Sequence, residues 1–243
     1  MVPVADCNFV DYFAAAATDE AKRCDLMTFF GCLAHAVQYL HEVKIRHRDI
    51  KPENILVKGD KVYLTDFGIS LDWENLTRST TTKDTAKSLV YCSPEVAHCE
   101  KRNSSTDIWS LGCVFLEMWT VLNGRSVQDM RQFFKLKSES YRFYENIPYF
   151  EEWESTLRSD SLLPVTPETW INGMLQEDPD KRESANSLYM KISYDSTHGK
   201  NLSNPFCGEC CIPDQESLSS EDDSDSDPLA TTAPLSPSLE FPP

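Results

Sequence analysis

The eight residues from His47 to Asn54, HRDIKPEN, include five side chains that are charged or carry a ring nitrogen. They run directly into the apolar stretch Ile55-Leu56-Val57. An exposed loop between a helix and a strand would account for this composition. A catalytic loop accounts for it too, because an acid, a cation and an amide held close together can bind a metal and move a proton.

A second polar cluster, Asp66-Phe67-Gly68, lies a short distance along the chain. Two short strands are predicted between the clusters, Ile55–Val57 and Val62–Leu64, joined by the turn Lys58-Gly59-Asp60. If these strands pair, Asn54 and Asp66 meet at one end of the hairpin. A carboxylate and an amide oxygen at that place suit Mg²⁺, which prefers oxygen ligands and shares them with phosphates.

Two further residues of the first cluster suggest a transfer reaction. Asp49, five residues before Asn54, would accept a proton from an attacking hydroxyl group. Lys51 would neutralise charge on the transferred group. The spacing therefore favours metal-assisted transfer of a phosphoryl group to a hydroxyl group.

Helices must position these two clusters. The apolar spacing predicts a long helix over residues 25–43 and a weaker, Ala-rich one from Asn8 to about Lys22. Residues 107–122 are apolar on nearly every face, which indicates a helix at the centre of a domain. One or two surface helices are expected within 127–157, a helix over 167–175 with Thr166 as its N-cap, and a closing segment at 183–192.

The formal charge of −16 is unevenly distributed. Residues 201–243 hold nine Asp or Glu and no Lys or Arg, which leaves −7 for the first 200 residues. Such a chain repels phosphate backbones, so nucleic-acid binding is disfavoured. No stretch is long and apolar enough to cross a bilayer. Nine cysteines without a signal-peptide pattern indicate thiols in a cytoplasmic or nuclear protein.

Five motifs occur together: HRDIKPEN at 47–54, DFG at 66–68, YCSPE at 91–95, DIWSLG at 107–112, and Arg182 in DPDKR. In this order and at these separations they resemble the C-terminal lobe of eukaryotic protein kinases of the serine/threonine class. The resemblance covers about residues 1–193. It implies a mainly α fold with a short β-hairpin, containing the hinge and the C-lobe only. Residues 194–243 are expected to form a disordered, Cys-containing acidic tail rich in Ser and Pro.

The resemblance assigns a role to each matching residue. Asp49 matches the catalytic base, and Lys51 the catalytic lysine that contacts the γ-phosphate of ATP. Asn54 and Asp66 match the Mg²⁺ ligands, and Leu56 the residue beneath the adenine ring. Five further matching residues concern the frame of the site: His47 and Phe67 in an apolar column, Asp107 as a buried anchor for the loop, and Glu95 with Arg182 as a buried structural ion pair.

The activation segment would run from Asp66 to Glu95. Arg48 is the kind of residue that pairs with a phosphorylated loop. Candidate acceptors are Ser79, Thr80, Thr81, Thr82 and Thr85, although simple solvation also explains these hydroxyl groups. Ser88 matches the hydroxyl that contacts the catalytic Asp and Lys. Lys87 departs from the family's usual Gly, and Ser93 from its usual Ala.

The family's glycine-rich loop, strand lysine and helix glutamate have no counterpart before His47. One interpretation is an N-terminally truncated serine/threonine kinase with weak or no turnover alone, which transfers phosphate from ATP to protein substrates. The alternative is a non-catalytic kinase-lobe scaffold. In either case we expect a partner to cover the surface left by the missing lobe.

Two features of the tail leave alternatives open. Cys207, Cys210 and Cys211, with His198, would hold zinc in one interpretation and remain thiols or acylation sites in another. The stretch 219–227 and Ser236-Pro237 resemble kinase substrate sites. A solubilising charge run explains the acidic stretch equally well.

Overall fold

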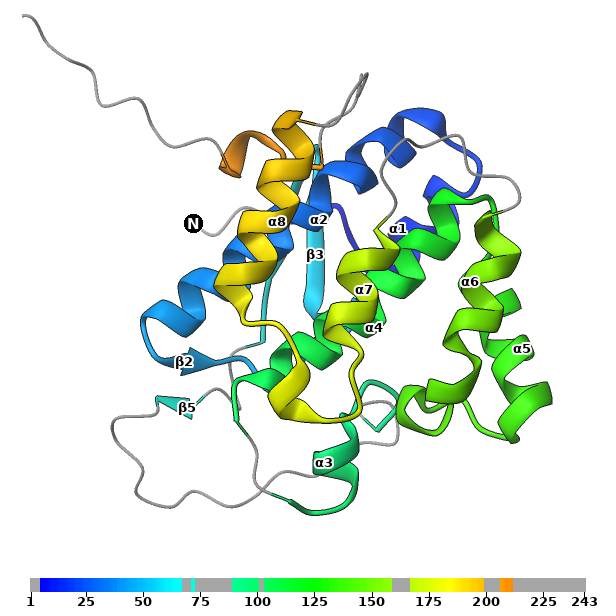
Figure 1. Cartoon of the computed structure of the whole chain (residues 1–243). Helices are drawn as coiled ribbons and strands as arrows, with labels where there is room; N and C mark the ends of the chain where they lie inside the picture. Colours follow the sequence, from blue (N-terminus) through cyan, green and yellow to red (C-terminus); the bar gives the residue numbers. More distant parts are fainter. Residues whose placement is uncertain are drawn as a thin grey trace, which may run out of the picture. The chain divides into compact units, whose positions relative to one another are not determined.

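The structure is a computed structural model. It describes residues 5–66, 71–72, 89–100, 103–158, 167–198 and 206–211. Helices dominate these residues, and five short strands form two small sheets (Figure 1). The architecture confirms the mainly α fold with a short hairpin that the sequence predicts. Of the predicted acidic tail, residues 194–243, the parts 199–205 and 212–243 lie outside the described residues.

Two helices open the fold. Helix α1 spans Phe9–Ala16, and its N-cap Asn8 accepts a hydrogen bond from the backbone of Asp11. Helix α2 spans Glu20–Glu42, where the side chain of Asp19 caps two backbone amides. Both predicted boundaries were therefore wrong: α1 ends before Lys22, and α2 begins five residues before residue 25. The reason is Asp19, whose carboxylate satisfies amides at a new helix start and so separates the two helices.

The hairpin consists of β3 (Ile55–Lys58) and β4 (Lys61–Leu64), and Ile55 is opposite Leu64. A two-residue strand, β1 (Cys7–Asn8), pairs with the outer side of β3. A second small sheet joins β2 (Ile45–Arg46) to β5 (Leu71–Asp72) in antiparallel register. The hairpin predicted from the sequence is confirmed, and each strand is extended by one residue.

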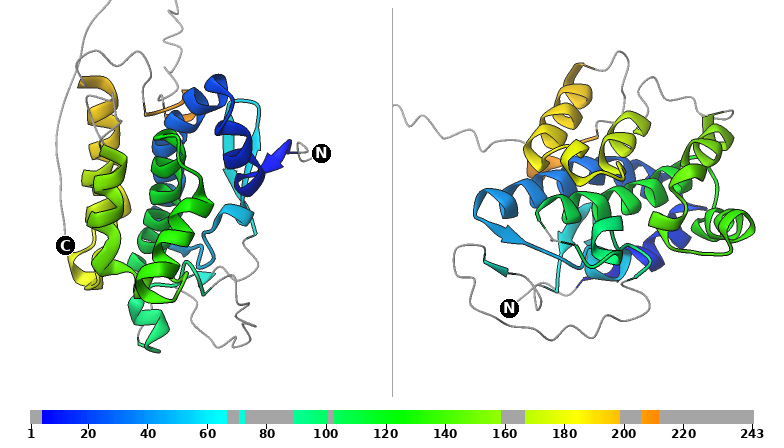
Figure 2. Two further views of the ribbon diagram at one scale, coloured as in Figure 1. Left: turned by 90° about the vertical axis from the view of Figure 1, so that its right-hand side faces the viewer. Right: turned by 60° about the horizontal axis from the view of Figure 1, so that its bottom comes forward.

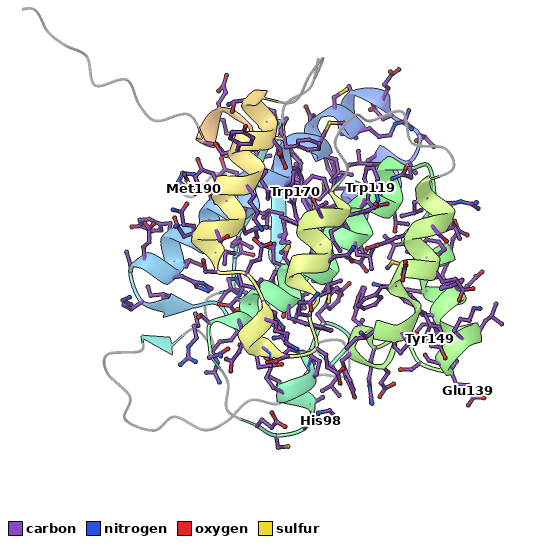
Figure 3. All side chains as sticks on the ribbon, in the orientation of Figure 1. His98, Trp119, Glu139, Tyr149, Trp170 and Met190 are labelled. Carbon is purple, nitrogen blue, oxygen red and sulfur yellow. The ribbon has the colours of Figure 1, made fainter. Side chains whose placement is uncertain are left out.

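Helix α4 (Ser105–Leu122) lies at the centre of the fold. Nearly all of its side chains are buried, as the apolar sequence predicts. In Figure 2 the strands β3 and β4 lie on one side of α4, and helices α7 (Glu168–Met174) and α8 (Ala185–His198) lie on the other. Trp119 of α4 and Trp170 of α7 are both buried and point into the interior (Figure 3).

Three helices lie around this centre. They are α3 (Pro94–Ala97), α5 (Val127–Ser138) and α6 (Phe150–Arg158). Two 3₁₀ turns, Phe143–Glu145 and Ile147–Tyr149, connect α5 to α6. The expectation of one or two helices within 127–157 is confirmed. Ser126 and Asp129 form a reciprocal capping box that starts α5.

The C-terminal part of the fold differs from the sequence prediction in two places. Helix α7 begins at Glu168 with Pro167 as its N-cap, whereas the sequence predicted a start at Pro167 behind Thr166, which lies outside the described residues. Helix α8 follows the 3₁₀ turn Pro179–Lys181 and continues to His198. Residues 206–211 also pack on the core through the buried Phe206 and Cys211. Helix α8 and residues 206–211 thus include described residues that follow the expected domain boundary at residue 193.

Among the helices described, none is long and apolar enough to cross a bilayer.

Candidate active site

A buried carboxylate holds the backbone of the catalytic-loop candidate. Asp107, in the first turn of α4, accepts hydrogen bonds from the amides of His47 (2.9 Å) and Arg48 (2.8 Å). The ring of His41, from the last turn of α2, lies 3.0 Å from the same carboxylate. Asp107 is therefore the anchor that the sequence predicted. The contribution of His41 was missed, because nothing in the spacing of the sequence connects residues 41 and 107.

The anchor fixes a backbone conformation that few side chains adopt. Arg48 has φ of 71°, in the left-handed region, although it is not a glycine. Such a conformation persists only where surrounding contacts determine it, and it is common at active sites. The two bonds to Asp107 supply those contacts and thereby set the direction in which Asp49 leaves the loop.

Three side chains converge directly after this turn. Lys51 Nζ lies 2.5 Å from Asp49 Oδ2. Asn54 Nδ2 donates to the same oxygen (2.9 Å) and to the Asp49 carbonyl (2.8 Å). The short 3₁₀ turn Pro52–Asn54 makes this convergence possible, because it folds Asn54 back toward Asp49. The Asp49 and Lys51 side chains retain 15% and 12% of their exposure, so the cluster remains in contact with solvent.

Asn54 and Asp66 come to the same end of the hairpin. Asn54 precedes β3, Asp66 follows β4 by two residues, and both the amide and the hydroxyl of Thr65 donate to the Asn54 carbonyl (2.9 and 3.1 Å). Asp66 is exposed and has φ of 64°. The side-chain nitrogen of Asn54 donates to Asp49. The side-chain oxygen of the same amide group therefore faces away from Asp49. This donor set, one amide oxygen and one exposed carboxylate, fits Mg²⁺.

His47, at the start of the catalytic-loop candidate, is fully buried. Its Nε2 lies 2.9 Å from the carbonyl oxygen of Thr65. Burial lowers the pKa of the ring, although Asp107 and the Thr65 carbonyl oppose that shift. The neutral ring therefore bridges the catalytic loop and the strand that leads to Asp66. Phe67, its expected neighbour in the apolar column, lies outside the described residues.

Leu56 lies in β3 between two neighbouring strands. It is opposite Asn8 of β1 and Tyr63 of β4, and it is half-buried. Tyr63 itself is exposed. The role of Leu56 beneath an adenine ring stays a prediction.

Most of the expected activation segment falls outside the described residues. This applies to all five candidate acceptors, to Ser88 and to Lys87, within 73–88. The described end of the segment is held by a buried cluster that the sequence did not reveal. Tyr91 donates its hydroxyl hydrogen to the Glu117 carboxylate (3.0 Å), and Arg131 of α5 donates to both residues (3.0 and 3.1 Å). Burial raises the pKa of Glu117 to about 7. After Asp107, Glu117 is the one acidic residue in the apolar stretch 107–122. Its presence there was the signal in the sequence that could have revealed this cluster.

Glu95 and Arg182 form the expected buried ion pair. The guanidinium donates two parallel hydrogen bonds to the carboxylate, at 2.7 and 2.8 Å. Arg182 also donates to the carbonyls of Gln176 (2.7 Å) and Glu177 (3.0 Å) and lies over the ring of Trp109. Burial by itself would raise the pKa of Glu95, but the hydrogen bonds from Arg182, Ser93 and the backbone, together with the charge of Arg182, outweigh burial and lower the pKa.

No group of three or more His, Cys, Asp or Glu side chains that could hold a metal ion is present in the described part of the chain. The side chains of His198 and Cys210 lie outside that part. The described residues therefore give no support to the interpretation that the tail cysteines hold zinc.

Comparison with known proteins decides the family. The sequence profile of the protein kinase domain matches residues 7–192, which include every element of the site. The chain belongs to the protein kinase family.

The relatives of this kinase domain include proteins from animals and plants. Human serine/threonine-protein kinase Sgk1 is 29% identical over 201 residues, which cover 77% of this chain and 43% of the relative. The cyclin-dependent kinase 4 homolog of Caenorhabditis elegans is 43% identical over 88 residues, 36% of this chain and 21% of the relative. Arabidopsis thaliana AtPK1/AtPK6 is 42% identical over 89 residues, 36% of this chain and 18% of the relative. The chain thus spans less than half the length of these relatives.

Proposed function

We propose that this chain carries the catalytic machinery for transfer of the γ-phosphoryl group of ATP to Ser or Thr hydroxyls of protein substrates. One observation carries the proposal: a single carboxylate oxygen of Asp49 is held at once by Lys51 Nζ (2.5 Å) and Asn54 Nδ2 (2.9 Å). This arrangement fixes a base beside a cation and a candidate metal ligand. It is the arrangement that phosphoryl transfer to a hydroxyl requires.

In the proposed step, the substrate hydroxyl oxygen forms a bond to the γ-phosphorus. The bond from that phosphorus to the β,γ-bridging oxygen breaks, and ADP leaves with the electron pair. Asp49 accepts the hydroxyl proton. Lys51 moves from Asp49 toward the equatorial oxygens of the transferred group and offsets their negative charge. The remaining exposure of both side chains leaves room for this change of partner.

Asn54 and Asp66 are the residues that would hold Mg²⁺, which neutralises charge on the ATP phosphates when bound. Leu56 would lie beneath the adenine ring. The exposed position of Asp66 and the half-buried position of Leu56 support this placement. The substrates are proteins, and the thiol-rich composition favours a cytoplasmic or nuclear setting.

Turnover by this chain alone is expected to be low. The residues before His47 contain one glycine, Gly31, and it lies inside α2, so no glycine-rich phosphate loop is formed there. Losing one preorganised charge-stabilising donor costs about 10²–10³ in rate. A partner that supplies phosphate contacts over Leu56 would raise the rate.

The test is phosphate transfer from radiolabelled ATP to a mixed Ser/Thr peptide library, at high enzyme concentration. Three proteins are compared: the unmodified chain, Asp49→Asn, and the matched control Asp60→Asn in the hairpin turn. We expect slow transfer that Asp49→Asn reduces by about 10²–10⁴-fold, the usual contribution of general acid–base catalysis. Asp60→Asn should leave the rate unchanged, because Asp60 lies at the far end of the hairpin.

Equal transfer by Asp49→Asn and the unmodified chain would refute the role of Asp49. If the unmodified chain transfers phosphate fast and Asp49→Asn does not, the proposed function is supported. The low rate expected for the chain alone is then refuted. An absence of both transfer and Mg²⁺-dependent ATP binding would instead favour a non-catalytic binding module.

A further inference from the structure

Residues 206–211, Phe-Cys-Gly-Glu-Cys-Cys, lie against helices α2, α7 and α8. We call this segment the strap; it is the orange segment beside α8 in Figure 1. Phe206 is completely buried, and its ring packs edge-on against Trp170 (4.8 Å between centroids) and Phe30 (6.2 Å). At the other end of the strap, Tyr189 donates its hydroxyl hydrogen to the Cys211 carbonyl (3.2 Å). The strap is therefore attached to the kinase core at both ends.

A glycine in the middle of α2, Gly31, allows the strap to lie close to the helix backbone. The amide of Gly31 donates to the Phe206 carbonyl at 2.8 Å. A Cβ atom on Gly31 would lie 2.4 Å from Cys207 Sγ and 2.8 Å from that carbonyl oxygen, closer than atoms can pack. Glycine costs about 1 kcal/mol relative to alanine inside a helix. The contact with the strap accounts for a glycine at a position where the helix itself would favour alanine.

The approach brings two thiols together. Cys32 follows Gly31 in α2, and its sulfur lies 4.0 Å from that of Cys211. Both residues are largely buried, at 6% and 9% exposure. A Cβ atom on Gly208 would lie 3.0 Å from Cys32 Sγ, so the strap backbone passes directly over this thiol. A disulfide requires a sulfur separation of about 2.0 Å, so closure needs a shift of about 2 Å at the end of two short side chains.

We propose that Cys32 and Cys211 form a peroxide-sensitive thiol pair whose disulfide fastens the strap to α2. In the first step, one thiolate attacks a peroxide oxygen; the O–O bond breaks, and a sulfenic acid and water result. In the second step, the other thiolate attacks the sulfenic sulfur and releases the hydroxyl group as a second water. Both sulfurs are oxidised and both peroxide oxygens are reduced, so the two electrons balance.

Access for the peroxide comes from the strap itself. Buried thiols react slowly, so Cys211, at the end of the strap, must first become accessible. Local opening at that end would expose Cys211, since short peripheral segments open far more often than a whole domain unfolds. When the segment closes again, an oxidised Cys211 meets Cys32. The proposal does not depend on phosphoryl transfer, so failure of either proposal leaves the other standing.

The test uses the full chain, treated with hydrogen peroxide and digested without reduction. Mass spectrometry should find a cross-linked peptide pair that contains Cys32 and Cys211. The melting temperature should rise by about 5–10 °C, because the disulfide closes a very long loop of the unfolded chain, and dithiothreitol should reverse the rise. Cys32→Ser and Cys211→Ser should each abolish both effects. The matched control Cys99→Ser, at an exposed cysteine beyond α3, should retain them.

A second variant tests the strap without oxidation. Gly31→Ala should lower the melting temperature of the reduced chain, although alanine favours the helix. A higher melting temperature would show that the strap is not seated on α2 and would overturn the proposal. It would also be overturned by peroxide treatment that leaves Cys32 and Cys211 as thiols or links other cysteines. Stoichiometric Zn²⁺ binding that blocks their oxidation would assign these thiols to a metal site instead.

Discussion

Two ion pairs of this kinase domain use the same chemistry for different purposes. Asp49–Lys51 lies in the proposed catalytic loop, where both side chains keep some contact with solvent. Glu95–Arg182 has 2% and 0% side-chain exposure, and the guanidinium is further held by three backbone carbonyls. In the proposed reaction the first pair exchanges partners, whereas the second pair keeps the same partners throughout. Burial and the number of additional hydrogen bonds would then separate a reactive pair from a structural one.

The largest expected effect comes from breaking the buried pair. Glu95→Ala should lower the free energy of unfolding by about 3–5 kcal/mol, because it leaves the Arg182 charge buried without its carboxylate. Urea denaturation measures this change. Asp49→Ala, which removes the carboxylate of the partly buried pair, serves as the matched comparison and should cost less, about 1–3 kcal/mol, because its side chains keep some contact with solvent. Equal losses in the two variants would remove the distinction between the pairs.

The next effect concerns ligand binding at the exposed site. With Mg²⁺ and ATP at about 100 times the dissociation constant, the chain should gain about 2.7 kcal/mol of stability. Asp66→Asn should remove most of this gain without changing the stability of the chain alone, because Asp66 is exposed. Thermal denaturation with and without Mg²⁺ measures both quantities. A gain that persists in Asp66→Asn would show that Asp66 does not hold the metal.

The pH dependence of stability should have opposite signs at two buried carboxylates. The pKa of Glu117 is raised to about 7 by burial, so its contribution to stability is present below about pH 4.5 and is lost as the pH rises through 7. The pKa of Glu95 is lowered, so its contribution is present above its unfolded pKa and is lost as the pH falls.

Glu117→Gln should therefore flatten the stability profile between pH 4.5 and 7, where each pH unit costs the unmodified chain up to about 1.4 kcal/mol. Denaturation midpoints measured across this range give the slope. The groups around Glu117 that must remain intact are Tyr91, Arg131, Glu53 and Cys113. An unchanged slope in Glu117→Gln would assign the pH dependence to another group.

The smallest effect on stability is expected at the lysine of the partly buried pair. Lys51→Met should lower the free energy of unfolding by about 1 kcal/mol, because Met keeps most of the apolar stem and Asn54 still donates to Asp49. A domain of this size melts about 2–4 °C lower for each kcal/mol lost, so the shift should be at most a few degrees. A loss as large as that of Glu95→Ala would show that the catalytic-loop pair is also structural.

The sequence predicted the fold and the site to different extents. The apolar stretch of α4 and the alternating hairpin were predicted well, because burial on every face or on one face leaves a direct pattern in the sequence. The break at Asp19 was missed, because an N-cap inside a continuous helical pattern gives a weak signal. The contacts of His41 with Asp107, and of Tyr91 with Glu117 and Arg131, join residues far apart in the chain. Such contacts depend on tertiary packing and have no local signature.

The anchoring of the loop by Asp107 also determines how its amide hydrogens exchange with deuterated water. The amides of His47 and Arg48 lie in a loop, yet both donate to a carboxylate that is itself buried at the start of the central helix. These two hydrogens can exchange only when α4 separates from the loop, which requires opening of the core. The amides of His47 and Arg48 should therefore exchange at the slow rate of the central helix, whereas Gly59, whose amide donates to the exposed side chain of Asp6, should exchange quickly.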